Sequence, residues 1–350
     1  MANNSSFNKQ GFVIILMLLF LSATVVLVTR LVNKCFLYAS FTKNTIDKIS
    51  AENLAFSGVN IAIAQLLDRR EKEDQEEKKE DNLQENFVKG ILPYINCWQE
   101  YSLDQEKDGV DGKLKIYLSC EDSKLNIDKI YDFKNKKFIG QGQQQGDMRG
   151  GCEKFFKQLE KSVGQDLFDV FEKFLKSRDY PINDVTELLI IKKFNKIFGD
   201  NVFPVSVEEN EKKKPIFLTD LFSIWSEAKI NPWFLSEGMC VLFGLDHIKE
   251  KRLDKRRQGM QEWFKNFKID AKWPAEWDTL LMPLYKRKAE VLPSWFFDIL
   301  SDNFKAATFS VLCCAQVGDV EKRLLAIIQG QQLYQQDDSG EFNIKRFYWL

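Results

Sequence analysis

The sequence predicts an α+β fold that begins with one very long helix. Three observations support this prediction. An apolar run near the N-terminus continues without a break into an amphipathic pattern, apolar residues alternate in segments of the remaining chain, and helical spacing of apolar residues fills the region between these segments. With 44% hydrophobic residues among 350, the chain has enough apolar material for a packed core.

Composition argues against several classes of function. Fifty basic and 51 acidic residues balance to a net charge of -1, so no overall field favours nucleic acid or an anionic surface. His247 is the single histidine, which excludes histidine-rich zinc sites and argues against a catalytic triad. The seven cysteines are scattered without a C-x-x-C pair, and we expect most of them to be buried, unpaired thiols.

The N-terminal helix is predicted from residues 12–28, a run without a charge, proline or glycine. This run is about 25 Å long as a helix, nearly enough to cross a bilayer core. A cleaved secretory signal, a plain membrane anchor and the first half of a longer rod are three interpretations of it. The rod is favoured because neither glycine nor proline occurs between Phe12 and Ser57, so the helix is expected to continue to Leu67.

The second half of this helix carries small residues on one face. Ala51, Ala55, Gly58 and Ala62 fall at positions i, i+4, i+7 and i+11. Such a stripe lets another backbone approach closely, and the alternative is the core face of an ordinary helix. Residues 68–82 are rich in charges of both signs and are predicted to form the helix end and a loop.

The beginning of the chain resembles a type IV pilin or pseudopilin. A polar leader ends in Gly11, and Phe12 opens the apolar helix. Residues 51–67, AENLAFSGVNIAIAQLL, resemble the A-x-x-L-A-x-x-G-x-x-x-A segment of the minor pseudopilin K of type II secretion systems, the general secretion pathway protein K. The resemblance implies that prepilin peptidase cuts between Gly11 and Phe12 and that Phe12 is then N-methylated.

Strands are predicted in two parts of the chain. Residues 113–120 alternate between polar and apolar side chains and lead into a tight turn. Runs at 304–316, 322–332 and 342–350 are separated by turn residues, which predicts an antiparallel meander. Between these parts, the spacing of apolar residues from Cys152 onward predicts amphipathic helices.

Three segments invite a ligand-binding interpretation that the residues do not favour. The glycines of residues 140–151 miss the spacing of a phosphate-binding loop, so this segment is predicted to be a flexible crossover. Residues 184–198 are predicted to form one helix capped at Asp184; a DNA-binding hairpin would need glycines where Lys192, Lys193 and Phe194 stand. Acidic residues interleave the basic cluster at 249–257, which is typical of a solvated helix.

Further segments match the pseudopilin K family in the same order along the chain. The turn after the first strand carries an acidic residue, a lysine and an asparagine, the helical part carries Glu-Leu-Leu, and a later segment carries Leu-Phe and Lys-Ile-Asn. Asn231 is expected to form a turn or cap a helix, although Pro232 and the two aromatic residues after it depart from the family. The positions that match are Asp122, Asn126, Glu187, Leu188, Leu221, Phe222, Lys229, Ile230 and Asn231.

The resemblance implies a pilin-like architecture. The long helix would pack on a small antiparallel sheet, and a large all-α domain would be inserted into that sheet. The expected parts are a leader at 1–11, the helix at 12–70 with its membrane part at 12–28, the first part of the α+β domain at 71–151, the inserted all-α domain at 152–298 and the last strands at 299–350.

The resemblance also implies a function in assembly and no catalytic residue. The chain would be a minor pseudopilin at the tip of the periplasmic pseudopilus of a type II secretion system, held in the bacterial inner membrane by one span with most of the chain in the periplasm. Its partners would be other minor pseudopilins, the major pseudopilin, prepilin peptidase and the membrane-embedded secretion platform, with no nucleic acid. No cofactor is identified from the residues, although members of this family can carry calcium in the helical domain.

One position in the membrane part bears on the place in the filament. Major pilins and pseudopilins carry glutamate at the fifth mature position, whereas Leu16 stands there in this chain. A leucine suits a subunit that has no neighbour above it to pair with a buried carboxylate. Two alternative functions are a minor pilin of a type IV pilus or DNA-uptake filament, and an inner-membrane-anchored periplasmic binding protein.

Overall fold

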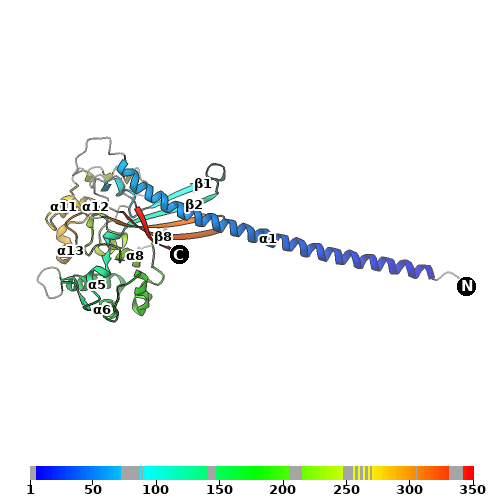
Figure 1. The fold of residues 1–350 in the computed structure, drawn as a ribbon, viewed down its shortest axis with the longest axis horizontal. Coiled ribbons are helices and arrows are strands. Elements are labelled where there is room, and N and C mark those ends of the chain that lie inside the picture. Colours follow the sequence, from blue (N-terminus) through cyan, green and yellow to red (C-terminus); the bar gives the residue numbers. More distant parts are fainter. Residues whose placement is uncertain are drawn as a thin grey trace.

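A helix of 67 residues dominates the molecule. The computed structural model describes residues 5–71, 87–88, 90–140, 147–204, 215–246, 270–304, 306–330 and 342–350, with short pieces between 255 and 268. Helix α1, Ser5–Glu71, is unbroken and extends about 100 Å at the helical rise. Its N-terminal half projects away from a globular head and its C-terminal half is part of that head (Figure 1). The long rod predicted from the absence of glycine and proline is therefore confirmed.

The head contains a five-stranded antiparallel sheet in the order β1-β2-β7-β8-β9. Its strands are β1 (Trp98–Leu103), β2 (Gly112–Cys120), β7 (Thr308–Val317), β8 (Val320–Gly330) and β9 (Phe342–Trp349). The strand after residue 112 and the C-terminal meander are confirmed, with shifted ends. The β1–β2 loop carries the short helix α3, Gln105–Asp108.

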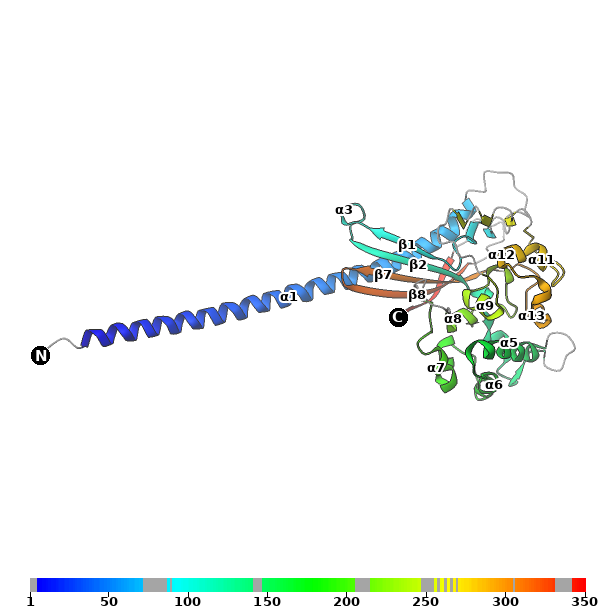
Figure 2. The same cartoon turned by 180° about the vertical axis from the view of Figure 1, so that it is seen from behind.

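Helix α1 packs on one face of this sheet, along the strands (Figure 2). Alternate residues of the strands, such as Ile116 and Cys313, face the helix and are fully buried. The residues between them, including Tyr117, Leu312 and Leu325, form a second, smaller apolar cluster on the opposite face. Both faces of the sheet are therefore covered in its central part.

A large insertion separates β2 from β7. Its helices gather at the end of the head that lies away from the free part of α1 (Figures 1 and 2). The insertion comprises short helical elements and turns, many of them capped by Asp, Asn or Ser side chains. Its α-helices are α4 (Ile127–Ile130), α5 (Met148–Val163), α6 (Phe168–Lys176), α7 (Lys192–Phe198), α8 (Leu218–Leu221), α9 (Glu237–Phe243), α11 (Trp277–Leu280), α12 (Met282–Tyr285) and α13 (Ser294–Asp298).

The insertion is not purely helical, which corrects the prediction of an all-α domain at 152–298. Strand β6 (Phe222–Ser223) lies within that range and pairs in parallel with β3 (Leu125–Asn126). A second small pair, β4 (Tyr131–Asp132) with β5 (Lys137–Phe138), also belongs to the insertion. Apolar spacing could not predict these strands, because each has two residues and β6 finds its partner far away along the chain.

The sheet and the insertion share one continuous apolar core. The same cluster of buried residues extends from Ala55 on α1 through the strands to Phe296 in the last helix of the insertion. Phenylalanines dominate its middle, where the ring centroids of Phe156 and Phe171 are 4.8 Å apart. The insertion thus packs as part of the head.

Two local predictions differ from the structure in detail. The helix expected at 184–198 is divided into a 3-10 helix, Val185–Ile190, and α7, because Ile191 is extended. Asp184 caps it as predicted, and Glu187 accepts a hydrogen bond from the Asn183 N–H at 2.8 Å. The crossover expected at 140–151 ends earlier, since α5 begins at Met148.

Some predicted segments lie outside the described residues. These are most of the charged stretch at 68–82, residues 141–146 of the crossover, most of the basic cluster at 249–257, the turn between β8 and β9, and His247.

Candidate functional site

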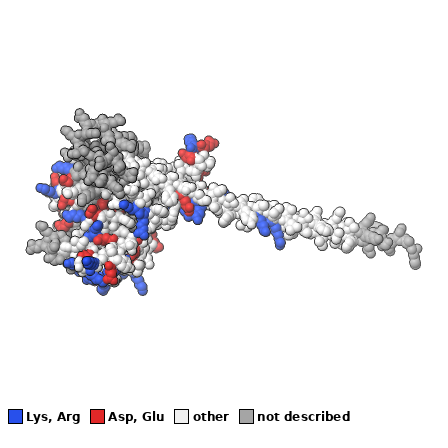
Figure 3. Space-filling model, viewed as in Figure 1, with Lys and Arg blue, Asp and Glu red and all other residues white. Residues whose placement is uncertain are grey.

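The first candidate site is the projecting half of α1. Its apolar side chains are exposed along its whole length, from Phe12 (66% exposed) to Phe41 (69%). Among the described residues it is the one helix long and apolar enough to cross a membrane. Its surface carries few charges, and these are blue lysines and arginines (Figure 3). An exposed apolar surface of this extent needs lipid or other protein to cover it.

Three hydroxyl groups of this segment are satisfied by the helix itself. Ser22 Oγ donates to Leu19 O at 2.9 Å, and Thr24 and Thr29 Oγ1 each donate at 2.8 Å to the carbonyl four residues earlier. In hydrocarbon a polar group without an internal partner is costly. The segment can therefore enter an apolar environment without leaving these hydroxyls unpaired.

The predicted processing residues lie at the start of this segment. Gly11 and Phe12 are inside α1, which begins at Ser5, and Leu16 is 44% exposed one turn further on. Cleavage at this junction and the role of Leu16 stay predictions.

The small-residue stripe lies against the sheet of the same chain. Ala51, Ala55 and Ala62 are fully buried, and Gly58 is buried with them. A Cβ added to Gly58 would come 2.8 Å from Cys313 Sγ and 3.0 Å from Leu114 Cδ1. These contacts describe the core face of a helix, the alternative that the sequence left open.

The second candidate site is a buried polar network where the insertion leaves and rejoins the sheet. Lys124 Nζ donates to Glu121, and Glu121 Oε2 accepts from Ser223 Oγ at 2.6 Å. Lys124 also lies 3.4 Å from Ser310 Oγ on β7. The Lys124 and Glu121 side chains are 2% and 6% exposed, so this ion pair is almost completely removed from water.

Asp122 and Asn126 extend the network to both ends of the insertion. Asp122 Oδ2 accepts from the Ala307 N–H at 2.8 Å and the Thr308 N–H at 3.1 Å, just before β7. Burial is the largest influence on Asp122 and raises its pKa to about 6, against the lowering effect of these N–H groups. The Asn126 amide donates to the Ser226 carbonyl, and its oxygen caps α4.

Six of the nine family-matching positions meet in this region. The Asn231 N–H donates to the Asp122 carbonyl at 2.7 Å, and Asn231 Oδ1 accepts from the Trp233 N–H, which agrees with the expected cap. Residues 221, 222 and 230 are buried beside them. Glu187, Leu188 and Lys229 lie elsewhere: Glu187 pairs with Arg178 at 2.6 Å, Leu188 belongs to the core, and Lys229 is exposed near Asp302.

No sequence pattern marks the buried charges as a group. Lys124 lies in a predicted turn, and the sequence signal for its ion pair is the i, i+3 spacing from Glu121. Ser223, Ser310 and Asp220 carry no local pattern that separates them from surface residues. The hydrogen bonds of Lys124, Glu121 and Asp122 tie strands and insertion together, which is a structural role.

Asp220, on α8, is buried and has an Oδ1 atom without a hydrogen-bond partner among the described residues. Burial raises its pKa to about 7; the Lys124 charge opposes the shift and Glu237 adds to it. Because the folded state holds this proton more tightly, the resulting stability is full below the unfolded pKa of 3.8 and is lost as the pH rises through about 7.

We therefore expect Asp220→Asn to change how stability depends on pH. Relative to the parent chain, the melting temperature of the variant should rise between pH 5 and pH 8, since asparagine cannot ionise. Circular dichroism in detergent at both pH values measures this difference. Asp111→Asn, at an exposed site, is the matched control and should show no such trend. If the melting temperature changed with pH by the same amount in the Asp220 variant and in the parent, the prediction would be contradicted.

The cysteines are consistent with the expected buried thiols. None of the seven forms a disulfide, and five of them are buried, the exceptions being the exposed Cys35 and the half-buried Cys314.

The described residues do not fit a calcium site. Calcium takes six to eight oxygen ligands, several of them from carboxylates. No group of three or more acidic, histidine or cysteine side chains able to hold a metal ion occurs in the part of the chain that the structure describes. We assign no role to calcium here.

Comparisons with known proteins give a likeness in structure and none in sequence. No protein-family model matches the chain, and no curated protein matches it in sequence. Among solved structures, it is similar to a chain of the GspK-GspI-GspJ complex from the enterotoxigenic Escherichia coli Type 2 Secretion System, with a TM-score of 0.47 and 10% identity over 88% of this chain and 98% of that chain. At this level the likeness decides neither family nor function.

Proposed function

We propose that this chain is a minor pseudopilin of a type II secretion system, a structural subunit and not an enzyme. One observation carries the proposal: a single continuous helix is apolar and exposed in its N-terminal half, while its C-terminal half is buried against an antiparallel sheet. This arrangement suits a subunit whose free half-helix lies in the membrane before assembly and packs among other helices afterwards. The sequence resemblance to pseudopilin K supports the same function.

Position within the filament is part of the proposal. The subunit sits at the tip of the periplasmic pseudopilus, starts its assembly with other minor pseudopilins and the major pseudopilin, and thereby supports protein export across the outer membrane. Supporting this, the bulky insertion lies at the end of the head away from the projecting helix (Figure 1). A head enlarged there fits an open end of a filament.

Removal of the leader tests the proposal. In a cell with an active prepilin peptidase, the mature chain should begin at Phe12 with one added methyl group, as measured by mass spectrometry of the intact protein. Gly11→Leu should leave uncut precursor, because a bulky side chain prevents the protease from approaching the backbone. Gln10→Leu, one position earlier, is the control and should be processed. Recovery of full-length chain with Met1 from the parent would favour an ordinary membrane anchor.

The tip position predicts a low copy number and a response to charge at position 16. We expect a few copies per filament by isotope-labelled mass spectrometry. Leu16→Glu should impair assembly, because an unpaired carboxylate in hydrocarbon costs at least ~2.5 kcal/mol and nothing above a tip subunit can neutralise it. Leu16→Gln introduces a side chain of the same size as glutamate but without its charge. Assembly of this variant should be closer to that of the parent. Amounts comparable to the major subunit along the shaft would refute the tip assignment.

A further inference from the structure

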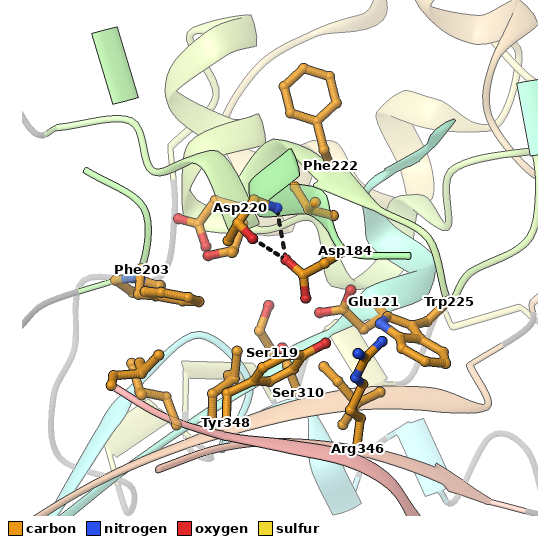
Figure 4. A pocket seen from close by; sticks show the side chains of 18 of the residues that line it. Ser119, Glu121, Asp184, Phe203, Asp220, Phe222, Trp225, Ser310, Arg346 and Tyr348 are labelled. Carbon is orange, nitrogen blue, oxygen red and sulfur yellow. Dashed lines mark hydrogen bonds between the residues drawn. The ribbon is translucent and has the colours of Figure 1, made fainter. Parts of the chain in front are cut away.

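A cavity of about 460 Å³ lies on the face of the sheet opposite α1. Residues of β2, β7, β8 and β9 form one side, and the insertion forms the other. In Figure 4, Ser119, Ser310 and Tyr348 rise from the strands, whereas Asp220 and Phe203 come from the insertion. A cavity of this size can hold a small organic molecule or a side chain of a partner.

Four buried polar atoms in the wall have no hydrogen-bond partner within the described part of the chain. They are the Tyr117 hydroxyl, Ser119 Oγ, Asp220 Oδ1 and the Tyr348 hydroxyl. The first three belong to residues that are at most 3% exposed. Buried polar groups in folded proteins are nearly always paired, and each of these four atoms can accept a hydrogen bond, so they indicate a partner that donates hydrogen bonds.

The charged side chains of the same wall are not all in ion pairs among the described residues. Glu121 and Lys124 neutralise each other through their ion pair. Arg346 is held at the outer side, where it donates to the Asn183 carbonyl at 3.0 Å and stacks on Tyr348. Asp220 is left without an ion pair to any residue that the structure describes.

We propose that this cavity binds a primary ammonium group carried on an apolar stem. The group has three N–H donors to offer to these atoms and one positive charge, which compensates ionised Asp220. Leu312, Leu325 and Ile327 offer apolar surface to the stem, and the aromatic rings in the wall attract a cation. A free alkyl amine and the lysine side chain of a partner share this chemistry.

Calorimetric titration of the full-length chain in detergent micelles tests the proposal. n-Hexylamine should bind and n-hexanol, with the same stem and no charge, should bind at least about tenfold more weakly. Asp220→Asn should reduce the affinity for the amine by about tenfold or more and leave hexanol unchanged. In a second arm, a short peptide with one lysine is compared with its norleucine analogue. Tighter binding of the lysine peptide than of hexylamine would identify a partner's side chain as the source.

The unpaired hydroxyls give variants that should fold normally. Tyr117→Phe and Ser119→Ala each remove a group without a partner, so the melting temperature should not fall, while the affinity for hexylamine should drop by about 2- to 10-fold. Tyr180→Phe, at a residue 60% exposed and outside the cavity, is the matched control. If the folded Asp220 and Tyr117 variants bind hexylamine as the parent does, or the parent binds it no better than hexanol, the cavity holds only water and the proposal is wrong.

Binding should also depend on pH. Lys124 and Glu121 on the segment after β2, Glu237 on α9 and Tyr117 on β2 are the charged or titratable groups that act on Asp220. Since the pKa of Asp220 is about 7, protonation competes with the ammonium group below that pH. The affinity for hexylamine should therefore be higher at pH 8 than at pH 6 in the parent and equal at both in Asp220→Asn; a parent without this difference would contradict the assigned contact.

Discussion

Lys124→Met should lower the free energy of unfolding by about 3–5 kcal/mol, the range observed when one partner of a buried ion pair is removed. The substitution keeps the length of the side chain, and methionine fills similar space. It leaves Glu121 charged at a site that is 6% exposed, with Ser223 Oγ as its other partner. Desolvation of that single charge is the cause of the expected loss. Urea unfolding of the parent and variant in detergent, followed by circular dichroism, gives the difference.

Two controls separate loss of the pair from loss of packing. Lys115→Met removes a lysine whose partner, Glu100, is 62% exposed, and should cost no more than about 1 kcal/mol. Adding Glu121→Gln to Lys124→Met removes the unpaired charge and should restore part of the stability. If Lys124→Met lowers the free energy of unfolding no more than Lys115→Met does, the buried network does not stabilise the connection between sheet and insertion.

Gly58→Leu should destabilise the head by about 1–3 kcal/mol or more through overpacking. The first carbon of any side chain at this position already meets Cys313 Sγ at 2.8 Å and Leu114 Cδ1 at 3.0 Å, so the helix must move off the sheet. The gain in helix propensity over glycine, about 1 kcal/mol or less, is too small to offset this. Thermal unfolding of the full-length chain measures the effect.

Asn60→Leu is the matched control on the same helix. Asn60 is exposed, so an added leucine meets no neighbour and stability should stay within about 0.5 kcal/mol. A stable Gly58→Leu protein would mean that α1 can leave the sheet at little cost, which would contradict the role of the small-residue stripe as a core contact.

Local physics explains the predictions that were confirmed. Helix α1 is continuous because no glycine or proline interrupts it between Phe12 and Ser57. The strands were recognisable because one buried face requires alternation, and the caps at Asp184 and Asn231 because their side chains bond to N–H groups two residues on. Each of these signals lies within a few residues of the chain.

Non-local contacts decided the features that were missed or left open. The small residues of α1 suit close packing against any backbone, and only the fold assigns them to β2 and β7 of the same chain. Strand β6 exists because β3, from the beginning of the insertion, lies beside it.

The sequence by itself therefore determined the long N-terminal helix, its apolar half, the strands of the sheet and the helical character of the region between them. Only the tertiary structure decided which charges are buried, how the insertion joins the sheet and where the cavity lies. The physical reason is that helix and strand preferences act between neighbours in sequence. The burial of Lys124, the pKa of Asp220 and the cavity depend on groups brought together from segments that are far apart along the chain.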